Sequence, residues 1–116
     1  MSFSRKILSL GIEVARDPVY TPAILVPDGA TQITAQFIYA LGGDGSSVVS
    51  MEQSSDGNNF DTVFDPSGSM VSITLDPADS SATLNINNLL AQWIRFSISF
   101  AAGSTGSVTS AIILTR

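Results

Sequence analysis

Residues 93–101 read W-I-R-F-S-I-S-F-A, and the alternation in this stretch decides the fold class. Apolar side chains occupy every second position: Ile94, Phe96, Ile98 and Phe100 alternate with Arg95, Ser97 and Ser99. A period of two buries one face of a β-strand and leaves the other face in water. The stretch therefore predicts a strand of an antiparallel sheet with one buried face.

The same period of two recurs along most of the chain. It predicts strands near residues 6–14, 22–26, 31–41, 46–54, 59–64, 70–75, 82–87, 93–101 and 107–115. Combinations of Asp, Asn, Gly and Pro separate these segments at intervals of about 10 to 15 residues, which is typical of a sandwich or barrel. No stretch has a helical period, and only residues 88–92 could form a short turn of helix.

Chain length and strand number together predict the architecture. The chain has 116 residues, the size of one domain. About eight or nine amphipathic strands would expose an apolar face in one open sheet, which favours two packed sheets. We therefore expect one all-β domain over residues 1–116, a two-sheet antiparallel β-sandwich resembling a jelly roll. Residues 1–6 are expected to form an extended N-terminal arm.

Three pairs of consecutive strands have the pattern of hairpins, because a short loop rich in turn residues joins each pair. These pairs are Phe37–Leu41 with Val48–Gln53, Met51–Ser54 with Phe60–Val63, and Trp93–Ala101 with Val108–Leu114. The sequence therefore predicts that the two members of each pair are neighbours in one sheet.

Composition excludes most enzyme chemistry. The chain has no cysteine and no histidine, which removes disulfides, thiolate nucleophiles, Ser-His-Asp triads and the usual transition-metal ligands. The net charge is −5, and five scattered basic residues are too few for a nucleic-acid surface. No segment reaches the length of a membrane span. Only 13% of residues are charged, and serine and threonine supply 27 of the 116, which suits a subunit that hides surface in an assembly.

The remaining candidate sites have simpler structural explanations. The acidic turn Asp56–Asp61 offers oxygen ligands for Ca²⁺, but it lacks the spacing of an EF-hand loop, and a hairpin turn accounts for Asp56-Gly57. A catalytic carboxylate pair is disfavoured because most aspartates lie in turns. A Ser-Lys dyad would need Lys6, which lies close to the terminus. We therefore expect no metal, no cofactor and no enzymatic activity.

Trp93 has the most informative position among the aromatic residues. The alternation places it on the strand face opposite Ile94, and we favour an interpretation in which its ring caps the end of the sandwich core. If the ring is exposed instead, Trp93 or Tyr39 with Asn58 and Asn59 would form a carbohydrate-binding surface.

Two segments resemble known proteins. The first is the strand–turn–strand segment Val49–Val63, where Asp56-Gly57 precedes Phe60 at a position often occupied by tryptophan. The second is Ala91–Ile98, followed by a turn at Gly103–Gly106 and a closing strand at Val108–Leu114. Over residues 30–116 the chain resembles small β-sandwich virion proteins of tailed bacteriophages. The closing segment is also similar to discoidin-like carbohydrate-binding jelly rolls.

The phage resemblance implies a structural role without catalysis. Such proteins are capsid decoration (cement) proteins, minor capsid proteins, or tail and fibre domains. We expect a decoration protein that is made in the host cytoplasm, resides in the virion and ties neighbouring capsomers together. Its partners would be the major capsid protein or other virion subunits, and a homo-oligomer, specifically a trimer, is expected. The alternatives are a carbohydrate-binding module and a small tail or fibre domain. The expected interface residues are Arg5, Lys6, Arg16, Tyr20, Asp44, Asp56 and Trp93.

Overall fold

The structure, a computed structural model, describes residues 4–87, 89 and 91–116. These residues form ten β-strands: β1 (Ser4–Glu13), β2 (Val19–Tyr20), β3 (Ile24–Leu25), β4 (Ile33–Gly42), β5 (Ser47–Ser54), β6 (Asp61–Thr62), β7 (Ser72–Leu75), β8 (Ser81–Ile86), β9 (Trp93–Ser99) and β10 (Thr105–Thr115). The described part of the chain contains no helix that is long and apolar enough to cross a membrane.

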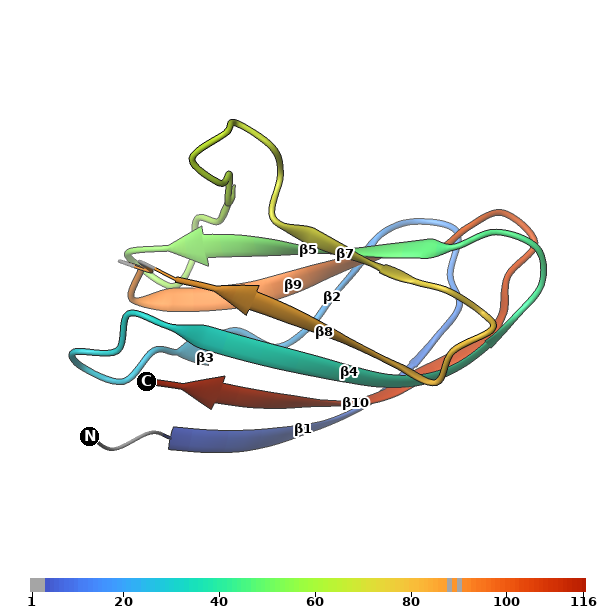
Figure 1. The fold of residues 1–116 in the computed structure, drawn as a ribbon, viewed down its shortest axis with the longest axis horizontal. Coiled ribbons are helices and arrows are strands. Elements are labelled where there is room, and N and C mark those ends of the chain that lie inside the picture. The colour runs from blue at the N-terminus through green and yellow to red at the C-terminus, as the bar shows by residue number, and fades with distance from the viewer. Residues whose placement is uncertain (1–3, 88, 90) are drawn as a thin grey trace.

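The strands form two antiparallel sheets (Figure 1). The first sheet has the order β1-β10-β4-β8, and the second has the order β2-β9-β5-β6, with β3 also paired to β9 and β7 also paired to β5. Counting β2 with β3, and β6 with β7, as single interrupted strands leaves eight. Numbered along the chain, these eight are arranged 1-8-3-6 and 2-7-4-5, which is the order of a jelly roll. The predicted all-β sandwich is confirmed.

Two of the three predicted hairpins are wrong. β4 and β5 belong to different sheets, and so do β9 and β10. The loops between them therefore cross from one sheet to the other. Only β5 and β6 pair as predicted, with Glu52 opposite Thr62. A short glycine-rich loop suits either connection, because two packed sheets are separated by only about 10 Å.

Strand boundaries differ from the prediction at two sheet edges. The strand expected near 22–26 is reduced to β3, and the unpredicted β2 precedes it, because the pairing with β9 shifts by one residue between Tyr20 and Ile24, around Pro22. The strand expected near 59–64 is reduced to β6. The chain then makes an excursion, residues 63–71, away from the sheet (Figure 1). Its two ends, Val63 and Val71, are hydrogen-bonded to Met51 of β5, and an isolated bridge between Phe64 and Met70 closes it.

The predicted N-terminal arm is wrong for residues 4–6, which belong to β1. Ser4 lies opposite Thr115 and Arg5 opposite Leu114, so the first and last strands run side by side (Figure 1). Residues 1–3 of that arm lie outside the described residues. So do residues 88 and 90 of the short helical turn expected at 88–92.

The core lies between the inner faces of the two sheets, and the predicted alternation identifies it correctly. Phe37 of β4 and Phe96 of β9 are fully buried and meet edge to face, with ring centroids 5.0 Å apart and an interplanar angle of 81°. This contact joins the middle of one sheet to the middle of the other. Other fully buried side chains surround the pair: Val49, Met51, Leu75, Ile94, Ile98, Val108 and Ile113.

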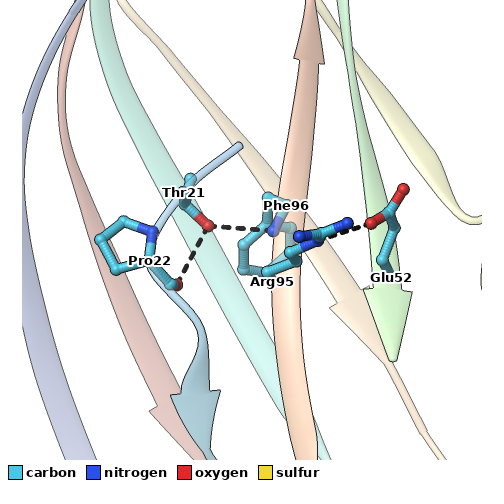
Figure 2. Close-up of polar contacts among 5 residues, drawn as sticks. All are labelled: Thr21, Pro22, Glu52, Arg95 and Phe96. Carbon is cyan, nitrogen blue, oxygen red and sulfur yellow. Dashed lines mark hydrogen bonds and ion pairs between the residues drawn. The ribbon is translucent and has the colours of Figure 1, made fainter. Parts of the chain in front are cut away.

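Thr21 maintains the hydrogen bonding of β9 at the break between β2 and β3 (Figure 2). Its backbone N–H donates to the carbonyl of Phe96 over 2.9 Å. Its hydroxyl oxygen accepts the N–H of Phe96, also over 2.9 Å, and donates to the carbonyl of Pro22 over 3.4 Å. Thr21 is buried, so a side chain supplies the acceptor that a continuous strand would supply from its backbone.

We expect Thr21→Val to lower the free energy of unfolding by about 1–3 kcal/mol, because it leaves a buried N–H of Phe96 without an acceptor. Urea unfolding followed by circular dichroism measures this loss. Thr109→Val is the matched control: the Thr109 hydroxyl donates to the carbonyl of Ile38, but Thr109 is exposed and water can replace it. Equal losses in the two variants would contradict the assigned role of Thr21.

Candidate functional site

The predicted interface residues lie in three separate places. Arg5 and Lys6 are exposed on β1. Arg16 and Asp44 are exposed in the loops before β2 and before β5, at the opposite end of β1. The other three, Tyr20, Asp56 and Trp93, converge on the outer face of the β2-β9-β5-β6 sheet, as the contacts below establish. The sequence therefore did not identify one continuous surface.

Arg95 organises this outer face. Its guanidinium lies over the ring of Tyr20, 4.1 Å from the centroid, and over the ring of Phe60, 4.3 Å from the centroid. Its Nε donates to Oε1 of Glu52 over 2.6 Å (Figure 2). Glu52 and Arg95 are opposite residues of β5 and β9, so strand pairing places the ion pair. The half-buried side chain thus ties β2, β5 and the end of the 55–60 turn to β9.

Trp93 belongs to the same face, and the predicted cap on the core is wrong. It is half-buried on β9, between the outer face and the turn after β5. A Cβ on Gly57 would come 3.1 Å from Cε2 of the indole, so the ring packs directly against this glycine. Gly57 has a φ of 81°, which also favours glycine there.

Asp56 shapes the turn against which Trp93 packs. Its Oδ1 accepts the backbone N–H groups of Asn58 and Asn59 and the hydroxyl of Ser54, each over 2.8 Å. Its Oδ2 accepts from Nδ2 of Asn59. The N–H groups of Asn59 and Asn58 hold the pKa of the Asp56 carboxyl well below its usual range. In the described residues, no group of three or more acidic side chains is arranged to hold a metal ion.

The Asp56 turn predicts a loss of stability in acid. A carboxyl whose pKa is lowered by folding stabilises the protein fully above the ordinary aspartate pKa of about 4, and this stabilisation is lost as the pH falls below it. We expect the melting temperature of the wild type to fall between about pH 4 and pH 2, and that of Asp56→Asn to fall less. Asp44→Asn, at an exposed aspartate in another loop, serves as the control. If the melting temperature of Asp56→Asn fell with pH as steeply as that of the wild type, the prediction would be contradicted.

A second surface lies on the outer face of the β1-β10-β4-β8 sheet. Ile7, Ile38, Ile112 and Leu114 project from it, and we call these four residues the outer apolar face. Ile7 is 59% exposed and the other three are half-buried. Ile7 and Ile112 are opposite each other on β1 and β10. The cross-strand rows that contain these residues have one charged side chain, Arg5, opposite Leu114.

A groove of about 740 Å³ lies between β8 and the 63–71 excursion. Phe64 and Met70, 62% and 44% exposed, border it over a buried floor that includes Val63, Val71, Leu84 and Leu89. Asp65 is the one acidic residue among its described lining. The Asp65 carboxyl accepts hydrogen bonds from Ser67 and Ser69 in its own turn. The bond from the Ser67 hydroxyl lowers the pKa of this carboxyl. A second hollow, of about 430 Å³, is bordered by Asp56 and Asp61.

The sequence missed the residues that build both surfaces. Arg95 and Phe60 gain importance only when β9 pairs with β5, which no local pattern reveals. The outer apolar face does have a sequence signal: Ala111–Leu114 is apolar at four consecutive positions and so breaks the alternation. Tyr39, named for carbohydrate binding, is 3% exposed, and its hydroxyl donates to the carbonyl of Asp76. Tyr39 is therefore unavailable to a ligand.

Comparison with known proteins supports the fold. No family model and no curated protein matches the chain. Among solved structures, it is similar to that of Bacillus endospore appendages, described as disulfide-linked pili (TM-score 0.53, 14% identity, 99% of this chain and 88% of that one). It is also similar to the SPBc2 prophage-derived protein YomS, with a TM-score of 0.54 and 11% identity over 100% of this chain and 96% of that one. A third is the CBM36-1 domain of a multidomain xylanase from the hindgut metagenome of Trinervitermes trinervoides (0.52, 9%, 95% and 96%). At these identities the likeness concerns the fold alone.

Proposed function

We propose that the chain is a non-enzymatic structural subunit of a virion, specifically a decoration protein that binds the assembled head of a tailed phage. The observation that carries the proposal is the outer apolar face. A sheet surface with Ile7, Ile38, Ile112 and Leu114 and one neighbouring charge is suited to permanent burial against another subunit. Binding only the assembled shell would stabilise that shell by mass action.

The structural neighbours are compatible with this role. One is a prophage-derived protein and another forms pili, so this fold occurs both in a phage-derived chain and in a subunit of a protein assembly. The hydroxyl-rich, charge-poor composition of the chain supports the same proposal. The virion is accordingly the proposed location, with capsid subunits as partners.

The carboxylates support a role without catalysis. Hydrolysis of a glycosidic bond by a carboxylate pair needs one group that stays protonated near neutral pH. Asp65 is the one acidic residue in the described lining of the groove, so that groove offers no carboxylate pair, and hydrogen bonds lower the pKa of Asp65 and of Asp56, which borders the second hollow with Asp61. Each side chain is also occupied in holding its own turn.

Particles from the organism that encodes the chain provide the first test. We expect the chain to co-sediment with purified particles after induction and to remain with heads when heads and tails are separated, as measured by mass spectrometry. Recovery with the tails would support the tail or fibre alternative. Absence from all particles would overturn the structural assignment.

The docking face has its own matched test. Ile38→Asp places a carboxylate in the outer apolar face, and we expect its occupancy on heads to fall about 10-fold or more, because burying an unpaired charge is costly. Val48→Asp is the control, since Val48 is also half-buried and outward on a middle strand of the other sheet. Equal occupancy of the two variants would exclude the outer apolar face as the contact.

A carbohydrate-binding module is the second candidate, and the side chains around Arg95 favour it. Tyr20, which packs on Arg95, is 48% exposed on the same outer face as the half-buried Trp93, and one structural neighbour is a CBM36 domain. Trp93 is the single tryptophan, so its fluorescence reports on this face alone. Saturable quenching by a soluble glycan, abolished in Tyr20→Ala, would support this function. A flat titration across a glycan panel would exclude it.

A further inference from the structure

The four sheet edges are unequal. The second sheet ends in β2 and β3, of two residues each, and in β6 and β7, of two and four residues, so both of its edges are short and broken. In the first sheet β8 packs beside β7 of the second. β1 is different: it has ten residues, and in the described part of the chain it pairs with β10 alone. Proteins usually shorten, cover, charge or bulge such an edge, because its backbone groups can pair with another chain. β1 carries charges and one irregularity, but it is neither short nor covered.

The two ends of β1 carry opposite charges. Arg5 and Lys6 lie near its start and Glu13 at its end, all exposed. Among the described residues, the ion pair present is Arg95 with Glu52, and neither Arg5 nor Glu13 takes part in one. In an antiparallel pairing of two copies of β1, the basic end of each strand lies beside the acidic end of the other.

We propose that two copies of this chain pair through the free edges of β1, antiparallel, about a two-fold axis at Ser9. Directly opposite residues in such a pair project to the same face. With the axis at Ser9, the basic end of each β1, with the exposed Arg5, lies beside the acidic end of the second copy, with the exposed Glu13. The irregularity between Ser9 and Ile12 sets the exact register there, and both side chains are on the outer face, because Leu8, Leu10 and Ile12 face the core. The symmetry forms the ion pair twice.

The same register gives the exposed Ile7 a contact. Ile7 of one copy lies close to Gly11 of the second copy, at the irregularity of β1. A Cβ on Gly11 would meet nothing within 4 Å, so the space over this glycine is open. The positive φ of Gly11, 56°, belongs to the irregularity between Ser9 and Ile12 in the pairing with β10. An isoleucine side chain over an edge glycine shields apolar surface and backbone together.

This dimer has a consequence for the outer apolar face. The two four-stranded sheets become one continuous sheet, and the outer apolar faces of the two copies meet across the axis with Ile7 near its centre. Two linked docking faces would bind a repeating surface with avidity. The pairing itself is a property of the isolated chain and does not rest on the virion assignment, so it is tested without particles.

Light scattering coupled to size exclusion tests the proposal on the full chain between about 1 μM and 1 mM protein. We expect the wild type to reach twice its mass of 12.1 kDa. Arg5→Glu, which replaces both ion pairs by like charges, should raise the dimer dissociation constant about 10-fold or more. The double variant Arg5→Glu/Glu13→Arg restores the opposite charges and should restore the dimer. Arg16→Glu makes the same charge change in an exposed loop outside β1 and should dimerise as the wild type does.

Hydrogen exchange supplies a second readout. Pairing protects those backbone amides of Ser4–Ser9 that point away from β10, and this protection increases as the protein concentration rises. A wild type that stays monomeric at about 1 mM would overturn the proposal. So would the trimer expected from the sequence, in place of this dimer, or a dimer that Arg5→Glu leaves intact. Failure of the folded double variant to regain the dimer would also overturn it, since the charges would then not face each other.

Discussion

Gly106→Ala should prevent folding, or lower the free energy of unfolding by at least about 3 kcal/mol, a loss that few single substitutions reach. Gly106 lies in β10 opposite Leu41 of β4, with a φ of 97° that L side chains rarely adopt. A Cβ at this position would overlap the carbonyl oxygen of Ala40, which is backbone and cannot rotate away. Two costs combine here: left-handed strain of about 1–2 kcal/mol and the separation of two central strands.

Gly68→Ala separates these two costs. Gly68 has a similar φ of 88°, but a Cβ there would meet nothing within 4 Å. We expect Gly68→Ala to lower the free energy of unfolding only by the cost of the left-handed backbone conformation, about 1–2 kcal/mol. Guanidinium unfolding curves of both variants give the comparison. Similar losses would mean that β10 moves away from β4 at little cost, against the close approach seen here.

Phe37→Ala should cost about 3–5 kcal/mol, a large share of the 5–15 kcal/mol by which domains of this size are usually stable. The ring is fully buried, and its loss leaves a cavity beside Phe96 at the centre of the sandwich. It also removes the edge-to-face contact between the two sheets. We therefore expect a lower unfolding midpoint in denaturant and a lower melting temperature.

The control for Phe37 is the same substitution at an exposed phenylalanine. Phe64 is 62% exposed on the 63–71 excursion, and Phe64→Ala should change stability by less than about 0.5 kcal/mol. If Phe37→Ala cost no more than Phe64→Ala, the sheets would not depend on this aromatic contact. The difference between the two variants therefore measures how much the burial of the ring contributes to stability, since the residue type is the same in both.

These two predictions depend on the sequence to different degrees. The inward position of Phe37 follows from the alternation of Ile33–Leu41 alone, because side chains on a strand point to opposite faces in turn. The demand for glycine at position 106 does not follow from any local pattern. It exists because β4 passes directly beside β10, and these strands are more than sixty residues apart in the chain.

The candidate surfaces show the same division. Trp93, Tyr20 and Asp56 were identified from residue type and turn chemistry, but only the structure brings them to one face. Arg95 joins them because β5 and β9 are paired, and the partner of a strand depends on contacts distant in sequence. The outer apolar face needs the same information, since Ile7, Ile38 and Ile112 lie on three strands.

Side-chain alternation and turn residues therefore predict only local features: the period of two, the turns, and the face of each strand that is buried. These depend on side-chain direction and on the few residues that tolerate turn geometry. The tertiary structure alone decided which strands pair. Glycine-rich loops permit both a hairpin and a crossing between sheets, and the choice is made by burying both inner faces together. For this reason β4 and β5 separate, Arg95 meets Tyr20 and Phe60, and β1 keeps a free edge.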